Sequence, residues 1–164
     1  KNMNIHDLKT RVMFTSSAGG HYSELCELDE LMKRYNSFLL TEDHEMMKEI
    51  KKTNQSRSWY MPAGTKEHLF KFLCNFPITI IRSFKAFLKV KPDVVIATGA
   101  HTTVPICYIA KLFGKKVIFI ETFANITTKT LSGKLVYPIA DLFLVQWEEM
   151  LELYPNAKYR GGLK

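Results

Sequence analysis

The sequence has few of the residues that build disulfide scaffolds or hold metal ions. Its 164 residues include three cysteines, Cys26, Cys74 and Cys107, and these show no metal-type spacing. We therefore expect reduced thiols in the core of a cytosolic protein, and no metal site. The sequence also lacks a run of about 18 uninterrupted apolar residues and a secretory signal, so we expect no membrane-spanning helix.

The common nucleotide-binding signatures are missing as well. No Gly-Lys-Ser/Thr follows at P-loop spacing, and Ala18-Gly19-Gly20-His21 does not satisfy G-x-G-x-x-G. We expect no cofactor. Glu42 nevertheless lies about where a dinucleotide site carries its ribose carboxylate, which keeps a dinucleotide-binding module as a minor hypothesis.

Acidic residues are scarcest in one segment. Between Lys66 and Lys91, six basic residues accompany a single acidic one, Glu67, so that +5 of the net charge of +7 lies there. No nucleic-acid recognition motif accompanies this charge. We therefore expect no nucleic-acid partner.

What is present is an alternation of short apolar runs and amphipathic segments. With 46% hydrophobic residues, the chain can build one core. We expect a polar lead-in over residues 1–10 and one Rossmann-like domain over 11–164, with a doubly wound, mostly parallel sheet. After an opening strand and helix, strands are predicted at 37–41, 58–61, 94–97, 116–120, 141–146 and 157–160, and helices at 42–52, 66–90, 105–113, 133–139 and 147–154.

The opening strand ends in a turn of small residues, Ser16, Ser17, Gly19 and Gly20, before a helix that starts near His21. Glycines let a backbone approach a ligand closely. The first amides of a helix lack partners and attract anions. The turn predicts an anion site, although ordinary helix capping by a serine explains the local sequence equally well.

A second turn, Thr98-Gly99-Ala100-His101, repeats this design after a buried strand, and Glu121 ends the next one. Because the carboxyl ends of parallel strands share one edge, we expect both turns and Glu121 to converge on one cleft. His21 and Glu121 are then candidates for a general base. The alternative for each is structural: a histidine that bonds its turn, and a carboxylate that caps a loop. His6, His44 and His68 are expected at the surface.

The segment 66–91 predicts a helix that Pro77 should kink or split. At 100° per residue its apolar side chains form one wide arc, and the basic ones lie opposite. A core-facing amphipathic helix is the plain interpretation. A helix in an anionic membrane interface also suits the pattern. The candidate docking residues are Phe70, Phe76, Ile80, Phe84, Phe87, Lys71, Arg82, Lys85 and Lys89.

Four stretches together carry a family resemblance: 12–21 (VMFTSSAGGH), 92–99 (PDVVIATG), 114–121 (GKKVIFIE) and 140–147 (ADLFLVQW). Over residues 11–162 the chain resembles bacterial capsular and exopolysaccharide glycosyltransferase subunits of the PssD type. These are similar to the membrane-associated subunit of the eukaryotic two-chain transferase that adds the second GlcNAc of the dolichol-linked precursor. The chain is more distantly similar to the N-terminal half of the transferase that glycosylates lipid I.

The resemblance implies one half of an inverting GT-B enzyme, placed peripherally at the cytoplasmic face of the cell membrane. This half would hold a polyprenyl-diphosphate-linked saccharide, while a separate nucleotide-sugar-binding subunit supplies the UDP-sugar. His21 or Glu121 would be the catalytic base. Unlike the eukaryotic subunit, the chain shows no N-terminal spanning anchor. The acceptor diphosphate would be bound by Ser16, Ser17, Gly19, Gly20, Thr98, Gly99 and His101.

Two functional hypotheses follow. In the first, the chain is the acceptor-binding, membrane-docking component of a split glycosyltransferase in capsule or exopolysaccharide synthesis, nearly inert without its partner. In the second, it is a non-catalytic enhancer that recruits the catalytic partner to the membrane.

Overall fold

The computed structural model describes residues 9–43, 57–62 and 69–163, without the side chains of residues 69–75. One seven-stranded sheet has the order β3-β2-β1-β4-β5-β6-β7. Every pairing between these strands is parallel. The strands are β1 (Arg11–Ser16), β2 (Asn36–Glu42), β3 (Ser58–Met61), β4 (Val94–Thr98), β5 (Lys116–Ile120), β6 (Leu142–Val145) and β7 (Lys158–Tyr159). The expected α/β domain with a doubly wound parallel sheet is confirmed.

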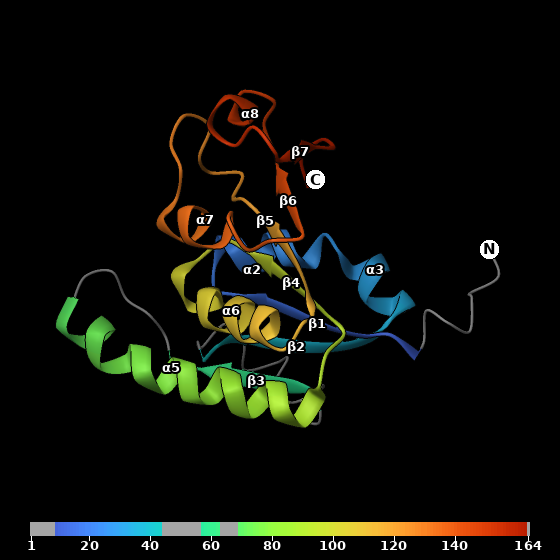
Figure 1. Ribbon diagram of the computed structural model, residues 1–164, viewed down its shortest axis with the longest axis vertical. Helices are drawn as coiled ribbons and strands as arrows, with labels where there is room; N and C mark the ends of the chain where they lie inside the picture. Colours follow the sequence, from blue (N-terminus) through green and yellow to red (C-terminus); the bar gives the residue numbers. More distant parts are fainter. Residues whose placement is uncertain (1–8, 44–56, 63–68, 164) are drawn as a thin grey trace.

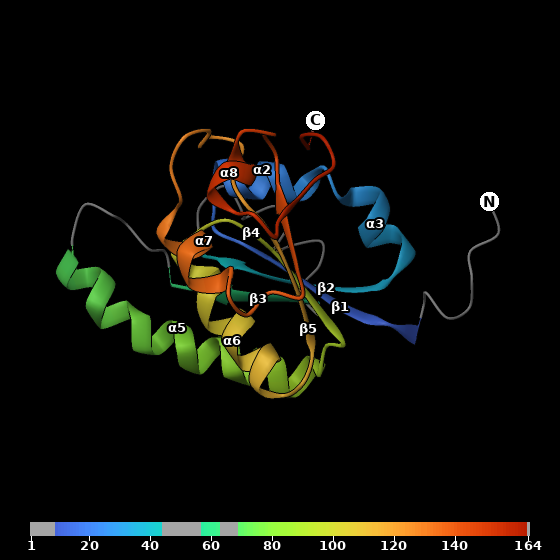
Figure 2. The ribbon, with the colours of Figure 1, turned by 45° about the horizontal axis from the view of Figure 1, so that its top comes forward.

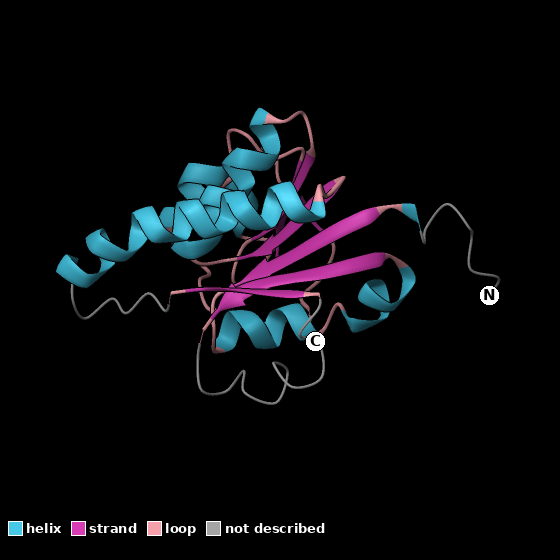
Figure 3. Ribbon diagram, turned by 90° about the horizontal axis from the view of Figure 1, so that it is seen from below, coloured by secondary structure: helices cyan, strands magenta, loops and turns pink. Residues whose placement is uncertain are grey.

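Helices cover both faces of the sheet (Figures 1 and 3). One face carries α2 (Gly20–Cys26) and α3 (Asp29–Arg34). The other carries α5 (Leu69–Val90), α6 (Val104–Leu112) and α7 (Leu131–Val136). A 3-10 turn, η2 (His101–Thr103), precedes α6, and α8 (Met150–Leu153) lies between the last two strands.

The strand alternation divides the core in two. Residues with side chains on one face of the sheet, such as Phe14 and Ile96, pack with Leu25 of α2. Their neighbours along the chain, such as Met13 and Val95, pack with α5 and α6. Successive strand residues point to opposite faces of the sheet. The face of a residue at a strand end therefore follows from the number of residues that separate it from a residue of known face.

Most predicted elements are found within about three residues of the expected bounds, and the largest differences lie at helix ends. Glu42 ends strand β2 instead of starting a helix, and residues 44–52 of that predicted helix lie outside the described residues. Helix α7 starts at Leu131, where the Thr130 side chain caps it by accepting the Gly133 amide. Pro77 lies inside α5 without splitting it.

The thiols do not all lie in the core. Cys107 is fully buried, and burial raises the pKa of its thiol to about 12. Cys26 is exposed, against the expectation of a core thiol, because it ends α2 on the side away from Leu25. Cys74, like His6, His44 and His68, lies outside the described side chains.

Two aspartates fix the register at the amino edge of the sheet. Asp93 precedes β4 and accepts a hydrogen bond from the first amide of β1, that of Arg11, at 3.0 Å. Asp141 precedes β6 and accepts from the Val117 amide of β5 at 2.9 Å. Lysines pair with both carboxylates, among them Lys115 with Asp93. The aspartates of the two family motifs 92–99 and 140–147 are therefore structural.

Candidate functional site at the carboxyl edge

The turns after β1 and β4 meet at the carboxyl edge of the sheet. The His21 ring lies directly against Gly99, where a Cβ atom would collide with it. The Thr98 hydroxyl donates to the His21 carbonyl at 2.8 Å. The structure thus brings together His21, Gly99 and Thr98, three of the residues singled out in the sequence.

Both turns use left-handed backbone. Gly19 has φ 80° and Gly99 φ 51°, and Ala100 is left-handed with φ 59° although it carries a Cβ. That conformation costs an L-residue roughly 1–2 kcal/mol. Thr103 offsets part of the cost by donating to the carbonyls of Gly99 and Ala100 at 2.7 and 2.9 Å. Thr103, which directly precedes α6, therefore stabilises the second turn, and His101 lies in the 3-10 helix of that turn.

Hydroxyls line the ends of three adjacent strands. Thr41, Ser16 and Thr98 are register neighbours, and all three point to the α2 face. Ser16 and Thr41 are completely buried, and neither hydroxyl has a hydrogen-bond partner among the described residues. Such groups are rare in folded proteins because each costs free energy. Ser17 instead donates to the Ala18 carbonyl.

Glu42 is already used by the protein. Its side chain is buried, and Oε2 accepts a hydrogen bond from the Ala18 amide at 3.2 Å. It therefore holds the Gly19 turn from the end of β2. This contact gives Glu42 a structural role in place of the ribose contact of the dinucleotide hypothesis.

Glu121 lies at the same edge but faces away from the cleft. Ile120 packs on the α2 side, so the next residue points to the α7 side. The Glu121 side chain is 0% exposed and accepts hydrogen bonds from the Thr130 and Tyr154 hydroxyls, both at 2.8 Å, and from the Thr122 amide at 3.0 Å. Of the two possibilities for this carboxylate, the geometry favours the loop cap over the general base.

Gly133 and Tyr154 complete the surroundings of Glu121. A Cβ on Gly133 would overlap the carboxylate, the Tyr154 hydroxyl and the Thr130 hydroxyl. Burial, followed by the hydrogen bond and the charge of Glu121, raises the pKa of Tyr154 far above its usual value. The tyrosine therefore stays protonated and continues to donate to the carboxylate.

Glu24 is a site residue that the sequence reasoning missed. It lies one helical turn after His21, and its Oε2 is 4.0 Å from His21 Nδ1. Its Oε1 accepts from the Thr122 hydroxyl at 2.9 Å and from the Phe123 amide at 3.1 Å. Gln146 donates to Oε2 at 3.3 Å. The spacing of three residues from His21 was the available signal, since such pairs share a helix face.

Helix α5 presents three different faces. Ala86, Phe87 and Val90 are buried against the sheet. The opposite side is a half-exposed apolar surface, which we call the α5 ridge: Ile80, Ile81, Phe84 and Leu88, exposed by 41, 54, 41 and 46%. The exposed basic residues Arg82, Lys85 and Lys89 lie between the ridge and β3, where Arg82 donates to the Tyr60 carbonyl.

This arrangement corrects part of the predicted docking face. Phe87 is 3% exposed, so it belongs to the core and not to the surface. The helical projection of the sequence placed Phe87 within the apolar arc, but it could not show which part of that arc packs on the sheet. Phe76 is partly exposed, whereas the side chains of Phe70 and Lys71 are outside the described residues. Ile80 and Phe84 lie on the ridge as predicted.

Exposed apolar side chains also lie on α6, which packs beside α5, and on α7, which packs beside α6 (Figure 2). Phe84 packs on Phe113, with ring centroids 6.2 Å apart, and the adjacent Leu112 is 83% exposed. Tyr108, one turn earlier on α6, donates to the Leu135 carbonyl of α7 at 2.7 Å. Leu135 is itself 42% exposed. Exposed apolar side chains therefore occur on or next to all three helices.

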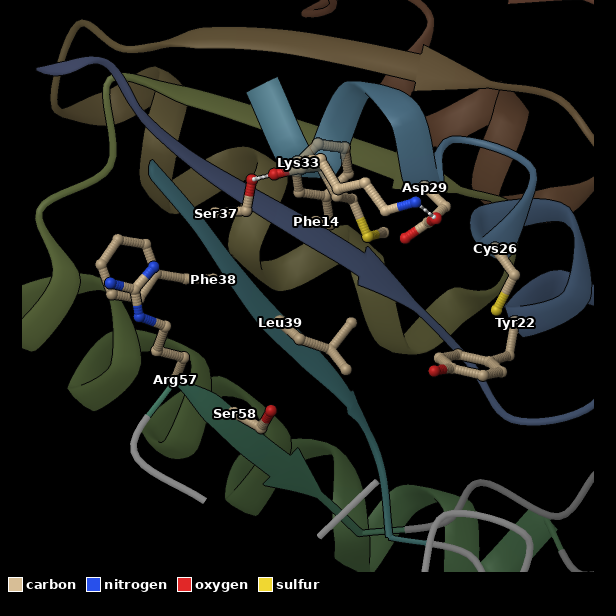
Figure 4. A pocket seen from close by; sticks show the side chains of 11 residues that line it. Phe14, Tyr22, Cys26, Asp29, Lys33, Ser37, Phe38, Leu39, Arg57 and Ser58 are labelled. Carbon is tan, nitrogen blue, oxygen red and sulfur yellow. Dashed lines mark hydrogen bonds and ion pairs between the residues drawn. The ribbon is translucent and has the colours of Figure 1, made fainter. Parts of the chain in front are cut away.

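A cavity of about 620 Å³ lies on the other face, between α2, α3 and the first strands (Figure 4). Phe14, Leu39 and Met32 line it, and the Lys33–Asp29 ion pair lies at its border. None of the site residues predicted from the sequence lines this cavity.

Within the part of the chain that the structure describes, no cluster of three or more His, Cys, Asp or Glu side chains is suited to a metal.

None of the described helices combines the length and the hydropathy needed to cross a bilayer.

The family profile described as "Oligosaccharide biosynthesis protein Alg14 like" matches residues 11–163. The rat UDP-N-acetylglucosamine transferase subunit ALG14 is 30% identical over 93% of this chain and 82% of its own length. The subunit from Yarrowia lipolytica is 27% identical over 93% and 81%.

Solved structures share the fold at low identity. MurG of Acinetobacter baumannii superposes with a TM-score of 0.65 at 14% identity, over 83% of this chain and 41% of that one. The UDP complex of Staphylococcus aureus MnaA gives 0.71 at 13% identity, over 94% and 45%. The chain thus spans less than half of each of these proteins.

Proposed function

Because the chain belongs to the Alg14-like family of oligosaccharide biosynthesis proteins, we propose that it is a non-catalytic subunit of a two-chain UDP-sugar transferase. It docks on a membrane surface and recruits the catalytic chain that binds the nucleotide sugar. The acceptor is a polyprenyl-diphosphate-linked saccharide. UDP-N-acetylglucosamine is the first donor to test, since the relatives carry it in their names.

The setting is part of the same proposal. A peripheral position at the cytoplasmic face of the cell membrane, in capsule or exopolysaccharide synthesis, comes from the sequence resemblance. The chain by itself is expected to transfer no sugar, because in this proposal the nucleotide sugar is bound by the partner chain.

The observation that carries the docking is the α5 ridge. Four large apolar side chains are half-exposed side by side, and three basic residues flank them. A monomeric soluble surface rarely leaves such a patch uncovered. Apolar residues bordered by basic ones fit the interface of an anionic bilayer, where burial of the side chains and attraction to the lipid headgroups add up.

Vesicle flotation tests the docking. Replacing Ile80 by Asp should weaken binding to phosphatidylglycerol-containing vesicles roughly tenfold or more, because burying such a side chain contributes about 1.5–3 kcal/mol. Ile126 is exposed by the same 41% but lies on the loop after β5, so Ile126→Asp is the matched control. Equal flotation of the two variants would contradict docking through the ridge.

Acceptor binding at the carboxyl edge is a second candidate, favoured by the unpaired buried hydroxyls of Ser16 and Thr41. They lie at the carboxyl ends of β1 and β2, next to the turn that holds His21. A diphosphate bound at this turn could accept hydrogen bonds. Here His21 is the candidate base. His21→Ala should abolish transfer by the reconstituted pair while partner binding and flotation stay unchanged. Full transfer by that variant would mean that recruitment of the partner is the only role of this chain in the reaction.

A further inference from the structure

The most connected polar group at the carboxyl edge outside the predicted site is the Glu24 carboxylate. Helix α2 carries it one turn after His21, and its side chain is 14% exposed. Its two oxygens accept three hydrogen bonds, from Thr122, Phe123 and Gln146. These donors come from the loop after β5 and from the residue that follows β6. One side chain therefore joins helix α2 to two loops of the edge.

The contacts continue one step beyond Glu24. Gln146 also donates to the Glu121 carbonyl at 2.9 Å and accepts from the Leu163 amide at 2.9 Å. Trp147 donates to the Phe123 carbonyl at 2.8 Å, and the rings of Phe123 and Trp147 pack with centroids 4.5 Å apart. The first residues of the loop are thus held both from α2 and from the end of β6.

The other end of the same loop is fixed separately by Glu121, through Thr130 and Tyr154. Between these anchors, residues 124–129 carry exposed or partly exposed side chains. A loop tied at both ends by hydrogen-bonded carboxylates keeps its position when the outer side chains contact a ligand. Such preorganisation lowers the entropic cost of binding.

We propose that Glu24 is a positioning residue of the acceptor site. It fixes the 122–123 backbone at a set distance from the His21 turn, and its Oε2 lies 4.0 Å from His21 Nδ1. The ligand is the saccharide diphosphate of the acceptor, which would lie between the two. This inference rests on the acceptor-binding role given above.

The test uses Glu24→Ala and Glu24→Gln in the full chain. Glutamine keeps the length of the side chain and can accept from Thr122 and Phe123, but its amide cannot accept from Gln146 while keeping both bonds. Glu27→Gln is the control, because Glu27 follows α2 and is exposed. Hydrogen exchange and acceptor kinetics are measured on the same preparations.

In Glu24→Ala, amide exchange at Phe123 and Ala124 should accelerate about tenfold or more, while the amides of β1 and β4 keep their protection. With a partner chain and a synthetic polyprenyl-diphosphate sugar, the acceptor KM should rise at least fivefold while kcat stays within twofold. Glu24→Gln should fall between Ala and wild type, and Glu27→Gln should match wild type.

Three results would overturn the inference: unchanged exchange at Phe123 and Ala124, acceleration of the β1 and β4 amides to the same extent, or a loosened loop with unchanged acceptor KM. Absence of transfer by the wild-type pair would instead overturn the proposed function, and the exchange data would still report whether Glu24 holds the loop. The two failures are therefore distinguishable.

Discussion

The two edges of the parallel sheet use acidic side chains in different ways. At the amino edge, Asp93 and Asp141 each accept one strand amide and pair with lysines, so their charge is neutralised by the protein. At the carboxyl edge, Glu24 and Glu121 take hydroxyl and amide donors from loops. Nearby, the Ser16 and Thr41 hydroxyls lack partners among the described residues.

This difference separates stability from function in one domain. The amino edge is electrostatically complete, and its polar groups set the strand register. The carboxyl edge keeps buried hydrogen-bonding capacity free beside preorganised loops, which is where an open α/β sheet binds its ligand. Substitutions at the two edges should therefore change different properties of the protein. Their expected effects on the free energy of unfolding can be ordered by size.

The largest expected effect is at Gly133, next to the Glu121 carboxylate. Gly133→Ala places a methyl group onto Glu121, Tyr154 and Thr130, and should lower the free energy of unfolding by about 3 kcal/mol in urea denaturation. Gly20→Ala is the control, because a methyl group there meets nothing within 4 Å. Equal stability of the two variants would mean that the loop around Glu121 is loosely packed.

Removing one donor to Glu121 should have the next largest effect. Tyr154→Phe leaves a fully buried carboxylate with fewer donors, at a cost of roughly 2 kcal/mol, because hydrogen bonds to charged groups are among the stronger ones. Tyr159→Phe, at an exposed position on β7, should be neutral. A cost below about 0.5 kcal/mol for Tyr154→Phe would show that this hydrogen bond contributes little to stability.

At the amino edge the expected effect depends on pH. Burial disfavours ionisation of Asp141, but hydrogen bonds from Val117, Lys111 and Lys116 outweigh it and lower its pKa. Since the folded pKa lies below the unfolded value of about 3.9, the stabilisation is present above that value and is lost as the pH falls through the folded pKa.

Asp141→Asn should therefore lower stability by about 1 kcal/mol at pH 7, and the difference from wild type should shrink below pH 4. Urea denaturation at several pH values measures this difference. The exposed carboxylate replaced in Glu27→Gln should show no such pH dependence. A difference that stays constant down to pH 2 would contradict the assignment.

The smallest expected effect is at the unpaired hydroxyls. Thr41→Val should change the free energy of unfolding by less than about 1 kcal/mol, with either sign, because the lost hydroxyl makes no bond within the described structure. Thr103→Val is the matched substitution, since that buried hydroxyl donates to two carbonyls, and it should cost about 1–2 kcal/mol. Equal losses of unfolding free energy in the two variants would contradict the distinction between hydrogen-bonded hydroxyls and those without a partner among the described residues.

Much of the fold could be predicted from the sequence because the strands are continuous apolar runs between clear turns. The runs at 94–97 and 116–120 became β4 and β5 with their expected bounds or one residue more. The convergence of His21 and Gly99 followed from the rule that parallel strands end at one edge. These inferences needed only the order and direction of the elements.

The details that failed depend on tertiary contacts. An apolar arc does not show which part meets the sheet, so Phe87 in the core and Phe84 on the ridge could not be separated. For Glu121 the two-residue alternation along β5 was available and would have placed its side chain on the α7 face. The partners of Glu24 lie about 100 residues away, and only its spacing from His21 hinted at a role.

The most direct test of the central claim is flotation of the catalytic partner itself with anionic vesicles. We predict that the partner floats only when this chain is present, and that Ile80→Asp releases it while Ile126→Asp does not. A partner that floats equally well without this chain, or with the Ile80→Asp variant, would contradict recruitment through the α5 ridge.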